Sequence, residues 1–222
     1  MRAWIRFGKQ PRLRFISHLD LQRFFQRAVN RTGLPIAYTQ GFNPHPVMSF
    51  GSALAVGWTS EYEVIDIRLC APMGRKRTED AVRAALPEDL PVLEARLVDD
   101  RHPAPMALVR MSDYRVTLGG PDAGAVIARI PEFLALDELL AVKKSKSGEK
   151  QVDIRPMAVS LEPLPDGFAA RLMLTEQSTL KPDMLINELA RMAGVEPPEA
   201  RIHRVALLGA DAQGGVQPLM TL

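Results

Sequence analysis

Cysteine is nearly absent from the chain: Cys70 is the single one among 222 residues, so no intramolecular disulfide can form. A self-contained iron–sulfur cluster is excluded too, because such clusters need several thiolates. One cysteine is typical of a protein from a reducing compartment. Long apolar runs are also missing, both the roughly 20 residues of a membrane span and the shorter core of a signal peptide in MRAWIRFGKQ. The sequence therefore predicts a cytoplasmic protein with no membrane segment.

Signatures of metal and nucleotide sites are missing as well. The histidines His18, His45, His102 and His203, together with Cys70, show none of the ligand spacings of zinc sites. The sequence has no dinucleotide fingerprint, no phosphate-cradling glycine motif and no nucleophile elbow. We therefore expect no metal site and no cofactor.

The overall composition is that of a globular protein, with 46% apolar and 24% charged residues. Its length suits one large domain or two smaller ones with their own cores. The net charge is only +2, but the first 31 residues contain eight basic residues against one acidic residue, a local charge of +7. Such a segment suggests an anionic partner such as a phosphate backbone. The alternative is a solvated, arginine-rich face.

Residue patterns in the first half predict the element order β-α-β-β-α-β. A helix should begin after Ser17, which can cap it, and end before Gly33, because apolar residues recur at helical spacing between them. A second helix is expected with Thr78 as its cap. Strands are predicted in the sequences AWIRFGK, PIAYTQ, EYEVIDIRLC and PVLEARLVD.

After a proline-rich linker, DRHPAPMA, the same order recurs. The segment DAGAVIARIPEFLAL predicts a helix that Pro131 kinks or splits, and KPDMLINELARMAG predicts a helix between Pro182 and Gly194. Strands are predicted in DYRVTL, VDIRPMAVSLEPL, GFAARLMLTE and ARIHRVALLG. The fold class is therefore α+β, with two tandem ferredoxin-like units at residues 1–102 and 108–222.

The stretch YTQGFNPHPVMSFG, from Tyr38 to Gly51, has far more turn chemistry than a hairpin needs. Prolines on both sides of His45 stiffen the segment, so Asn43 and His45 are candidate ligand-binding residues. We expect this loop to fold back on the start of the first helix, where both would approach His18 and Asp20. Asp20 is therefore a further candidate ligand-binding residue. There His18 and His45 would form an acid–base pair. The alternative is a long hairpin loop folded over a sheet edge.

Basic residues supply the candidate nucleic-acid contacts. We expect the arginines of the N-terminal segment and the lysines of KKSKSGEK to bind phosphates. These residues are Arg12, Arg14, Arg23, Arg27, Lys143, Lys144, Lys146 and Lys150. The sequence KKSKSGEK predicts a hairpin arm. Asp153 and Arg155, which follow on a strand, are candidate ligand-binding residues that could instead pair with each other.

The stretch FISHLDLQRFFQRAVNRTGLPIAYTQGFNPHPVMSFGSALAVG resembles the signature of the radical-SAM-linked protein family. The matching positions are Ser17, His18, Asp20, Gly41, Phe42, Asn43, Pro44, His45, Pro46, Ser49, Phe50, Gly51 and Gly57, and a second block matches at Lys150, Asp153, Ile154, Arg155 and Pro156. Such domains extend radical SAM proteins or stand beside them, often near RNA-processing genes. The resemblance implies an accessory role with a radical SAM partner, which would carry the radical chemistry because this chain lacks the three-cysteine motif.

Three hypotheses follow from these observations. The first is an RNA-binding accessory protein that presents substrate to a radical SAM enzyme. The second is a metal-independent endoribonuclease of duplicated ferredoxin-like architecture, similar to CRISPR repeat-cleaving RNases, with His18 or His45 as general base. The third is a small-molecule carrier for a radical SAM partner, with its pocket under the glycine-rich loop.

Overall fold

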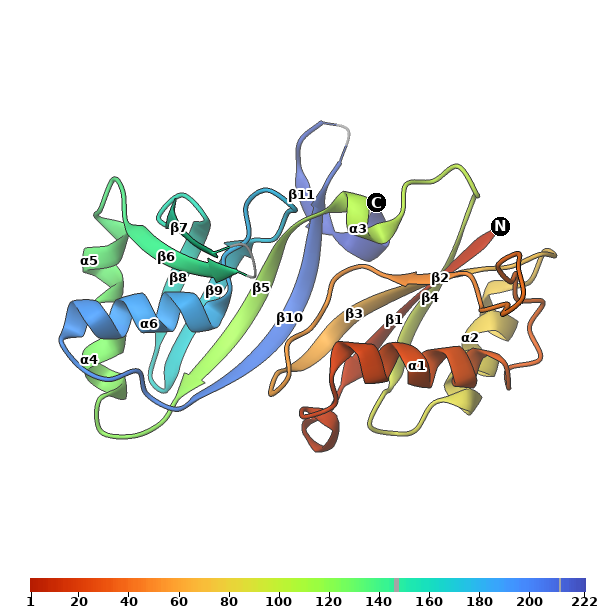
Figure 1. Ribbon diagram of the computed structural model, residues 1–222, viewed down its shortest axis with the longest axis horizontal. Helices are drawn as coiled ribbons and strands as arrows, with labels where there is room; N and C mark the ends of the chain where they lie inside the picture. The colour runs from red at the N-terminus through yellow and green to blue at the C-terminus, as the bar shows by residue number, and fades with distance from the viewer. Residues whose placement is uncertain (146–147, 212) are drawn as a thin grey trace. The chain divides into compact units, whose positions relative to one another are not determined.

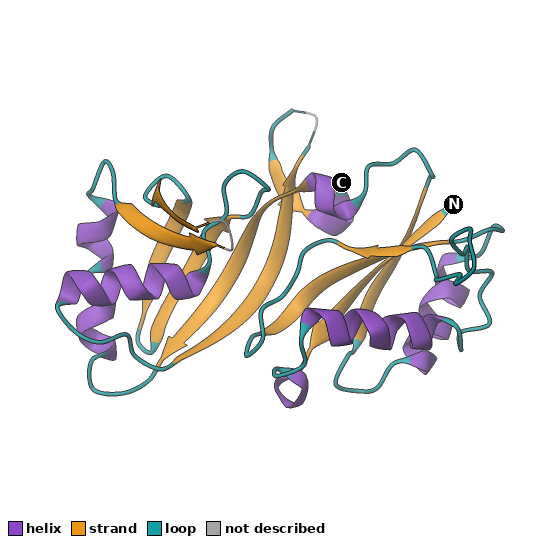
Figure 2. Ribbon diagram, in the orientation of Figure 1, coloured by secondary structure: helices purple, strands orange, loops and turns teal. Residues whose placement is uncertain are grey.

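The computed structural model describes residues 1–145, 148–211 and 213–222 and is an α+β protein dominated by β-sheet (Figures 1 and 2). The chain divides into two compact units. Unit 1 comprises Met1–Val109 and Ala206–Leu222, and unit 2 comprises Arg110–Val205. Among the described residues, no helix is both long and apolar enough to cross a membrane.

This division differs from the expected boundary, because the C-terminal residues belong to unit 1. Leu219 and Met220 are buried there. Arg96 donates a 2.9 Å hydrogen bond to the Met220 carbonyl, and the Met220 N–H donates to the Tyr62 hydroxyl at 3.1 Å. The tail, for which the sequence has no local signal, thus completes the first unit.

Unit 1 is built around strand β1, which pairs antiparallel with β3 and β4, while the short strand β2 pairs antiparallel with β3. Helices α1 and α2 pack on one face of this sheet. The elements are β1 (Arg2–Lys9), η1 (Pro11–Leu13), α1 (His18–Val29), β2 (Met48–Phe50), β3 (Thr59–Arg68), α2 (Arg75–Ala85), β4 (Val92–Val98), α3 (Pro105–Leu108), β11 (Val216–Pro218) and η2 (Leu219–Thr221).

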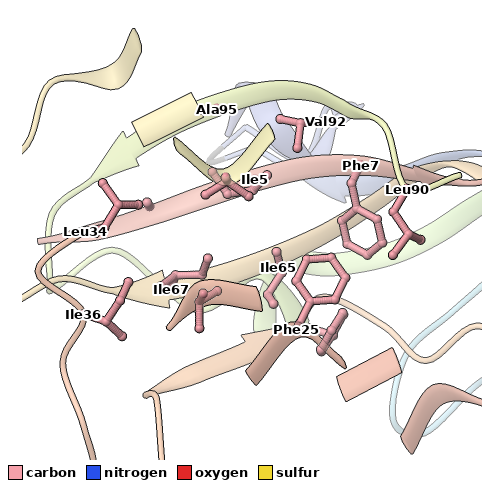
Figure 3. Packing of buried hydrophobic residues seen from close by; sticks show 14 of the residues in the cluster. Ile5, Phe7, Phe25, Leu34, Ile36, Ile65, Ile67, Leu90, Val92 and Ala95 are labelled. Atoms are coloured by element: carbon pink, nitrogen blue, oxygen red, sulfur yellow. The ribbon is translucent and has the colours of Figure 1, made fainter. Parts of the chain in front are cut away.

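Helix α1 forms as its sequence predicts. The Ser17 hydroxyl accepts the N–H of Asp20 at 3.1 Å, which satisfies one of the free donors at the helix start. The stripe that includes Leu21 and Phe25 is buried against the sheet. Figure 3 shows Phe25 lying against Phe7 and Ile65 in this core, and the ring centroids of Phe7 and Phe25 are 4.7 Å apart.

Two expectations for unit 1 are wrong. The predicted strand PIAYTQ makes only isolated bridges, at Ile36 and Tyr38, and the strand that pairs with β3 is instead Met48–Phe50, inside the supposed loop. Pro35 begins the earlier segment and Pro46 lies opposite Tyr38, and neither proline has the N–H group that a continuous ladder needs. Thr78 does not cap α2 either. It is buried within the helix, where its hydroxyl donates to the Gly74 carbonyl at 3.0 Å.

Unit 2 has a sheet in which β9 lies between β5 and β8, with β10 beside β5, and a separate two-stranded sheet of β6 and β7. Strand β10 continues from this unit into unit 1. The elements are β5 (Val109–Leu118), α4 (Ala123–Ile127), α5 (Ile130–Leu134), β6 (Leu140–Ser145), β7 (Gly148–Asp153), β8 (Ala158–Leu164), β9 (Gly167–Met173), α6 (Pro182–Ala193) and β10 (Ala200–Ala210).

Several local predictions for unit 2 are confirmed. Pro131 stands at the start of α5, and the expected helix is split into α4 and α5. Helix α6 begins at Pro182 and ends at Gly194, which has the left-handed φ of 70° that glycine favours. The described residues at the two sides of the lysine-rich segment pair antiparallel as β6 and β7, with Lys143 opposite Lys150.

Candidate functional site

The turn between β1 and α1 is held in place by a buried lysine. Lys9 has only 1% of its surface exposed, and its ammonium group donates to the carbonyls of Arg14 at 3.2 Å and Ile16 at 2.9 Å. Burial lowers the pKa of Lys9, and the nearby Glu63 carboxylate partly opposes that effect. The two hydrogen bonds from Lys9 therefore hold in place the backbone that carries Arg12 and Arg14.

Arg12 and Arg14 project from this turn into solvent. The Arg14 guanidinium lies 4.4 Å from the centroid of the Phe15 ring, and Phe15 itself is 69% exposed. Arg12 has 86% of its side chain exposed and lies 3.5 Å from Asp89. An exposed aromatic ring with a cation stacked on it offers both a flat apolar face and positive charge.

The other two predicted arginines lie on the solvent side of α1. Arg23 is 60% exposed and 3.6 Å from Asp20, and Arg27 is exposed one turn further on. We call Arg12, Arg14, Arg23 and Arg27 the arginine surface. All four predicted arginines are thus available to a ligand.

His18 and His45 do not share a site, so the expected approach of Asn43 and His45 to the helix start is wrong, although Phe50 at the end of the same stretch does lie against His18. His18 is the first residue of α1, with its ring centroid 5.1 Å from that of Phe50. His45 exchanges hydrogen bonds of 2.9 and 3.0 Å with Thr39. The neighbouring Tyr38 is bonded to Asn30, at the other end of the 12-residue helix, about 18 Å away.

The loop exposes its predicted ligand-binding residues nonetheless. Asn43 and His45 are both exposed, and Phe42 beside them is fully exposed. Asp20, by contrast, is engaged at the helix start, where its carboxylate accepts the Ser17 hydroxyl at 2.6 Å.

Asp153 and Arg155, the other two candidate ligand-binding residues, make contacts within the chain. The Asp153 carboxylate accepts the N–H groups of Leu139 at 2.9 Å and of Arg155 at 3.1 Å. The Arg155 guanidinium donates to the carbonyls of Leu134 at 3.0 Å and Ala158 at 3.2 Å. Their side chains therefore fasten the base of the β6–β7 hairpin to α5 and do not pair with each other.

Three of the four predicted lysines, Lys143, Lys144 and Lys150, belong to the strands of this hairpin. Lys143 and Lys150 are exposed, and the Lys143 ammonium lies 3.4 Å from the Thr179 carbonyl. The backbone of Lys144 lies in β6, and Lys146 falls outside the described residues.

A pocket lies in unit 1, on the sheet face opposite the helices, and its charged lining residues were not predicted. It has a volume of about 240 Å³ and is lined by residues of β1, β2, β3 and the segment after β4, among them Arg2, Ser49, Asp66 and Arg68. We call it the Asp66 pocket. Its wall includes Val47 and Met48, which directly follow the NPHP motif. The turn-rich stretch thus leads straight into a pocket wall.

The charged centre of this pocket is the pair of Arg2 and Asp66, 2.9 Å apart, whose side chains are only 13% and 6% exposed. Burial raises the pKa of the Asp66 carboxyl, whereas the Arg2 charge and the nearby Trp4 indole oppose that rise. The sequence did carry a signal for it. Asp66 interrupts the apolar run of β3 between Ile65 and Ile67, which are buried on the other face.

No group of three or more His, Cys, Asp or Glu side chains that could hold a metal ion occurs within residues 1–145, 148–211 and 213–222.

The model of a bacterial family described as "Uncharacterized protein conserved in bacteria (DUF2344)" matches residues 2–186. The chain belongs to this family. Over 91% of its length this family member is similar to a chain of the "Crystal Structure of a Cbf5-Nop10-Gar1 Complex", with a TM-score of 0.52 and 14% identity. The match covers 47% of that chain, so the protein spans about half of its length, and the likeness concerns the fold alone. The comparison with curated proteins gave no match.

Proposed function

We propose that this protein is a cytoplasmic, RNA-binding accessory protein that works with a radical SAM enzyme in RNA modification or processing. The observation that carries the proposal is the stacked pair of Arg14 and Phe15 beside the exposed Arg12. Arginines bind phosphates through charge-assisted hydrogen bonds, and exposed aromatic rings stack on unpaired bases. The two together suit single-stranded RNA.

The arginine surface extends the contact beyond one nucleotide. Arg23 and Arg27 lie on successive turns of α1, which continues from the turn that carries Arg12 and Arg14. A row of arginines can follow a phosphate backbone without reading its sequence. We therefore expect binding with little sequence preference at this surface.

We further infer that the two units are ferredoxin-like. In unit 1, the chain order is β-α-β-β-α-β and the strands lie in the order β4-β1-β3-β2. In unit 2, strands β8 and β9 and then α6 follow the split helix α4–α5, and β10 lies beside β5. Both orders support a duplicated split βαβ arrangement.

The radical SAM partner rests on the motif resemblance and on the single cysteine. Cys70 alone cannot hold a cluster of the kind that radical SAM chemistry needs. An accessory role assigns that chemistry to a second protein. Co-elution of this chain with a radical SAM protein from the same genome tests the assignment, and separate elution of the two at micromolar concentrations would contradict it.

The endoribonuclease alternative has weaker support, because His18 and His45 lie at opposite ends of α1 and cannot act as an acid–base pair. The carrier alternative is favoured by one observation, the Asp66 pocket beneath the residues that follow the NPHP motif.

RNA binding can be tested by fluorescence anisotropy of a short single-stranded RNA across a salt series. Affinity should fall steeply with salt, and the double variant Arg12→Ala, Arg14→Ala should reduce the slope by about 0.7 for each phosphate that the variant no longer binds. Phe15→Leu should weaken binding at unchanged slope, because it removes stacking and no charge. The control is Arg129→Ala in unit 2, whose guanidinium pairs with Glu132 at 2.7 Å. Absence of binding at low salt, or a flat salt response, refutes the proposal.

A further inference from the structure

The Asp66 pocket presents a buried acceptor that no described residue satisfies. The Asp66 side chain is 6% exposed, and its Oδ2 atom accepts a 2.9 Å hydrogen bond from Arg2. Its other oxygen, Oδ1, is buried and has no hydrogen-bond partner in the part of the chain that the structure describes. The Trp4 indole is near enough to influence the carboxyl, but its N–H makes no hydrogen bond of ordinary geometry with it. A buried acceptor of this kind favours a ligand that donates to it.

Asp66 is also held rigidly. The guanidinium of Arg2 donates not only to Asp66 but also to the carbonyls of His102 and, at 3.2 Å, Pro103. Arg2 therefore cannot swing away, and the free oxygen of Asp66 keeps its direction. A site whose groups are already fixed loses little conformational entropy when a ligand binds.

The rim of the pocket has a loosely engaged cation. The Arg68 side chain is 53% exposed and lies 3.6 Å from the exposed carboxylate of Asp100. An exposed pair at this distance contributes little to stability and is easily rearranged. Arg68 can therefore turn to a phosphate group, with which arginine makes two parallel hydrogen bonds.

The pocket has the size for one small heterocycle. Its volume of about 240 Å³ lies below the range of about 300–1,000 Å³ of sites for drug-sized ligands. Val47 and Met48 give it an apolar wall, on which a flat ring can lie. A carboxylate inside and an arginine at the rim match a ligand with an N–H donor at one end and an anionic group at the other.

We propose that the Asp66 pocket binds a nucleotide whose base carries an exocyclic amino group, with that group donating to Oδ1 of Asp66 and the phosphate at Arg68. Carboxylates accept from the amino group of cytosine in this way in base recognition, and bases splayed out of a single strand are read through such edges. The inference rests on the proposed function in taking RNA as the source of the base, and a free mononucleotide presents the same chemistry.

Binding of CMP and UMP to the purified chain, measured by isothermal titration calorimetry, tests the proposal. CMP should bind, and UMP, which lacks the amino group, should bind about 10-fold more weakly. Asp66→Asn can turn an amide N–H toward the base, because its carbonyl oxygen can stay with Arg2. The affinity of this variant for CMP should be about 10-fold lower than that of the parent protein, and the preference for CMP over UMP should be lost. Arg68→Ala should lower the affinity for CMP to that for cytidine.

Two further variants test whether binding takes place in this pocket: one changes its shape, and the other changes a residue outside it. Ala104→Leu narrows the pocket without changing its charges and should also abolish CMP binding, since Ala104 lines the wall. Arg77→Ala, which removes an exposed arginine from α2 outside the pocket, should leave binding unchanged. Circular dichroism spectra that match the parent protein establish that each variant is folded.

The outcomes separate this proposal from the function on which it rests. If the chain binds RNA through its arginine surface but neither CMP nor UMP, the nucleotide pocket is refuted and RNA binding stands. If CMP binds and RNA does not, the proposed pocket is supported with a free nucleotide as its ligand, and the RNA-binding function is refuted. Equal affinities for CMP and UMP, or an unchanged CMP affinity in Asp66→Asn, would mean that Asp66 does not receive the amino group of the base, and would refute the proposed recognition.

Discussion

The hydroxyl group of Tyr38 donates a 2.6 Å hydrogen bond to the side-chain oxygen of Asn30, the residue that follows α1. This bond anchors the start of the turn-rich loop at the C-terminal end of the helix. His18 stands at the opposite end, so the loop cannot bring His45 to it. The loop instead exposes Phe42, Asn43 and His45 at its tip and then supplies Met48 to a pocket wall.

Removing the Tyr38 hydroxyl should loosen the loop without unfolding the protein. In Tyr38→Phe the missing bond joins two exposed side chains, so the free energy of unfolding should fall by less than about 1 kcal/mol. Hydrogen exchange of the amides of Thr39 and His45 should speed up. The matched control is Tyr62→Phe, which leaves the buried N–H of Met220 without its hydrogen-bond acceptor. This change should lower the free energy of unfolding by about 1–3 kcal/mol. Equal losses in urea denaturation would show that the loop bond does not act locally.

Helix α1 illustrates what the sequence is able to predict. Its cap, Ser17, and its apolar stripe through Leu21 and Phe25 are local signals, and each is found where expected. The split at Pro131 is equally local, because proline removes a donor wherever it stands. Sequence patterns within one turn or one helix therefore predict the local structure correctly.

The Asp66 pocket illustrates what the sequence conceals. Trp4 and Ser49 flank Asp66 only because β1 and β2 pair with β3 in one register. A shift by one residue would turn Asp66 into the core. Contacts between residues so far apart in sequence depend on that pairing, which strand propensity does not specify. The same holds for the tail, whose Leu219 finds its place in unit 1 without any local signal.

Lys9 should be a major contributor to the stability of unit 1. Its ammonium group is the donor for two carbonyls of the turn before α1, and the nearly buried Glu63 balances its charge. Lys9→Met should lower the free energy of unfolding by about 3–5 kcal/mol, because it leaves a buried charge and two acceptors uncompensated. Lys76→Met, which removes a lysine that is 89% exposed, should change it by less than about 0.5 kcal/mol. Chemical denaturation distinguishes the two, and similar small losses would contradict the assigned role.

Asp66 should impose a pH dependence on stability. Burial holds the pKa of its carboxyl above the ordinary value of 3.8, so the folded protein keeps this proton after the unfolded chain has lost it. A folded state that binds more protons loses stability as pH rises. This contribution should therefore be most favourable below about pH 4 and should be lost as pH rises through the raised pKa.

Asp66→Asn removes the titrating group and keeps its shape. The difference in the free energy of unfolding between this variant and the parent should move in favour of the variant as pH rises from about 3.5 to 6.5. Urea denaturation at several pH values measures it. Asp113→Asn is a suitable control, because that carboxylate is 27% exposed in unit 2 and bound by Arg171 at 2.7 Å. A difference for Asp66→Asn that stays constant with pH would mean that the buried carboxyl does not titrate in this range.

Gly167, at the first position of β9, has no room for a side chain. A Cβ atom there would lie 1.9 Å from the carbonyl oxygen of Val116 on the paired strand β5. At this distance the atoms overlap, so the backbones of β5 and β9 would have to separate. Gly167→Ala should therefore lower the free energy of unfolding by at least about 2 kcal/mol, since the β5–β9 ladder must open to admit the methyl group. Gly124→Ala is the matched control, because nothing lies within 4 Å of its Cβ position in α4. That change should be neutral or stabilising by up to about 1 kcal/mol. Thermal melts of both variants decide the matter: a Gly167→Ala protein as stable as the parent would mean that β9 does not pair with β5 in the stated register.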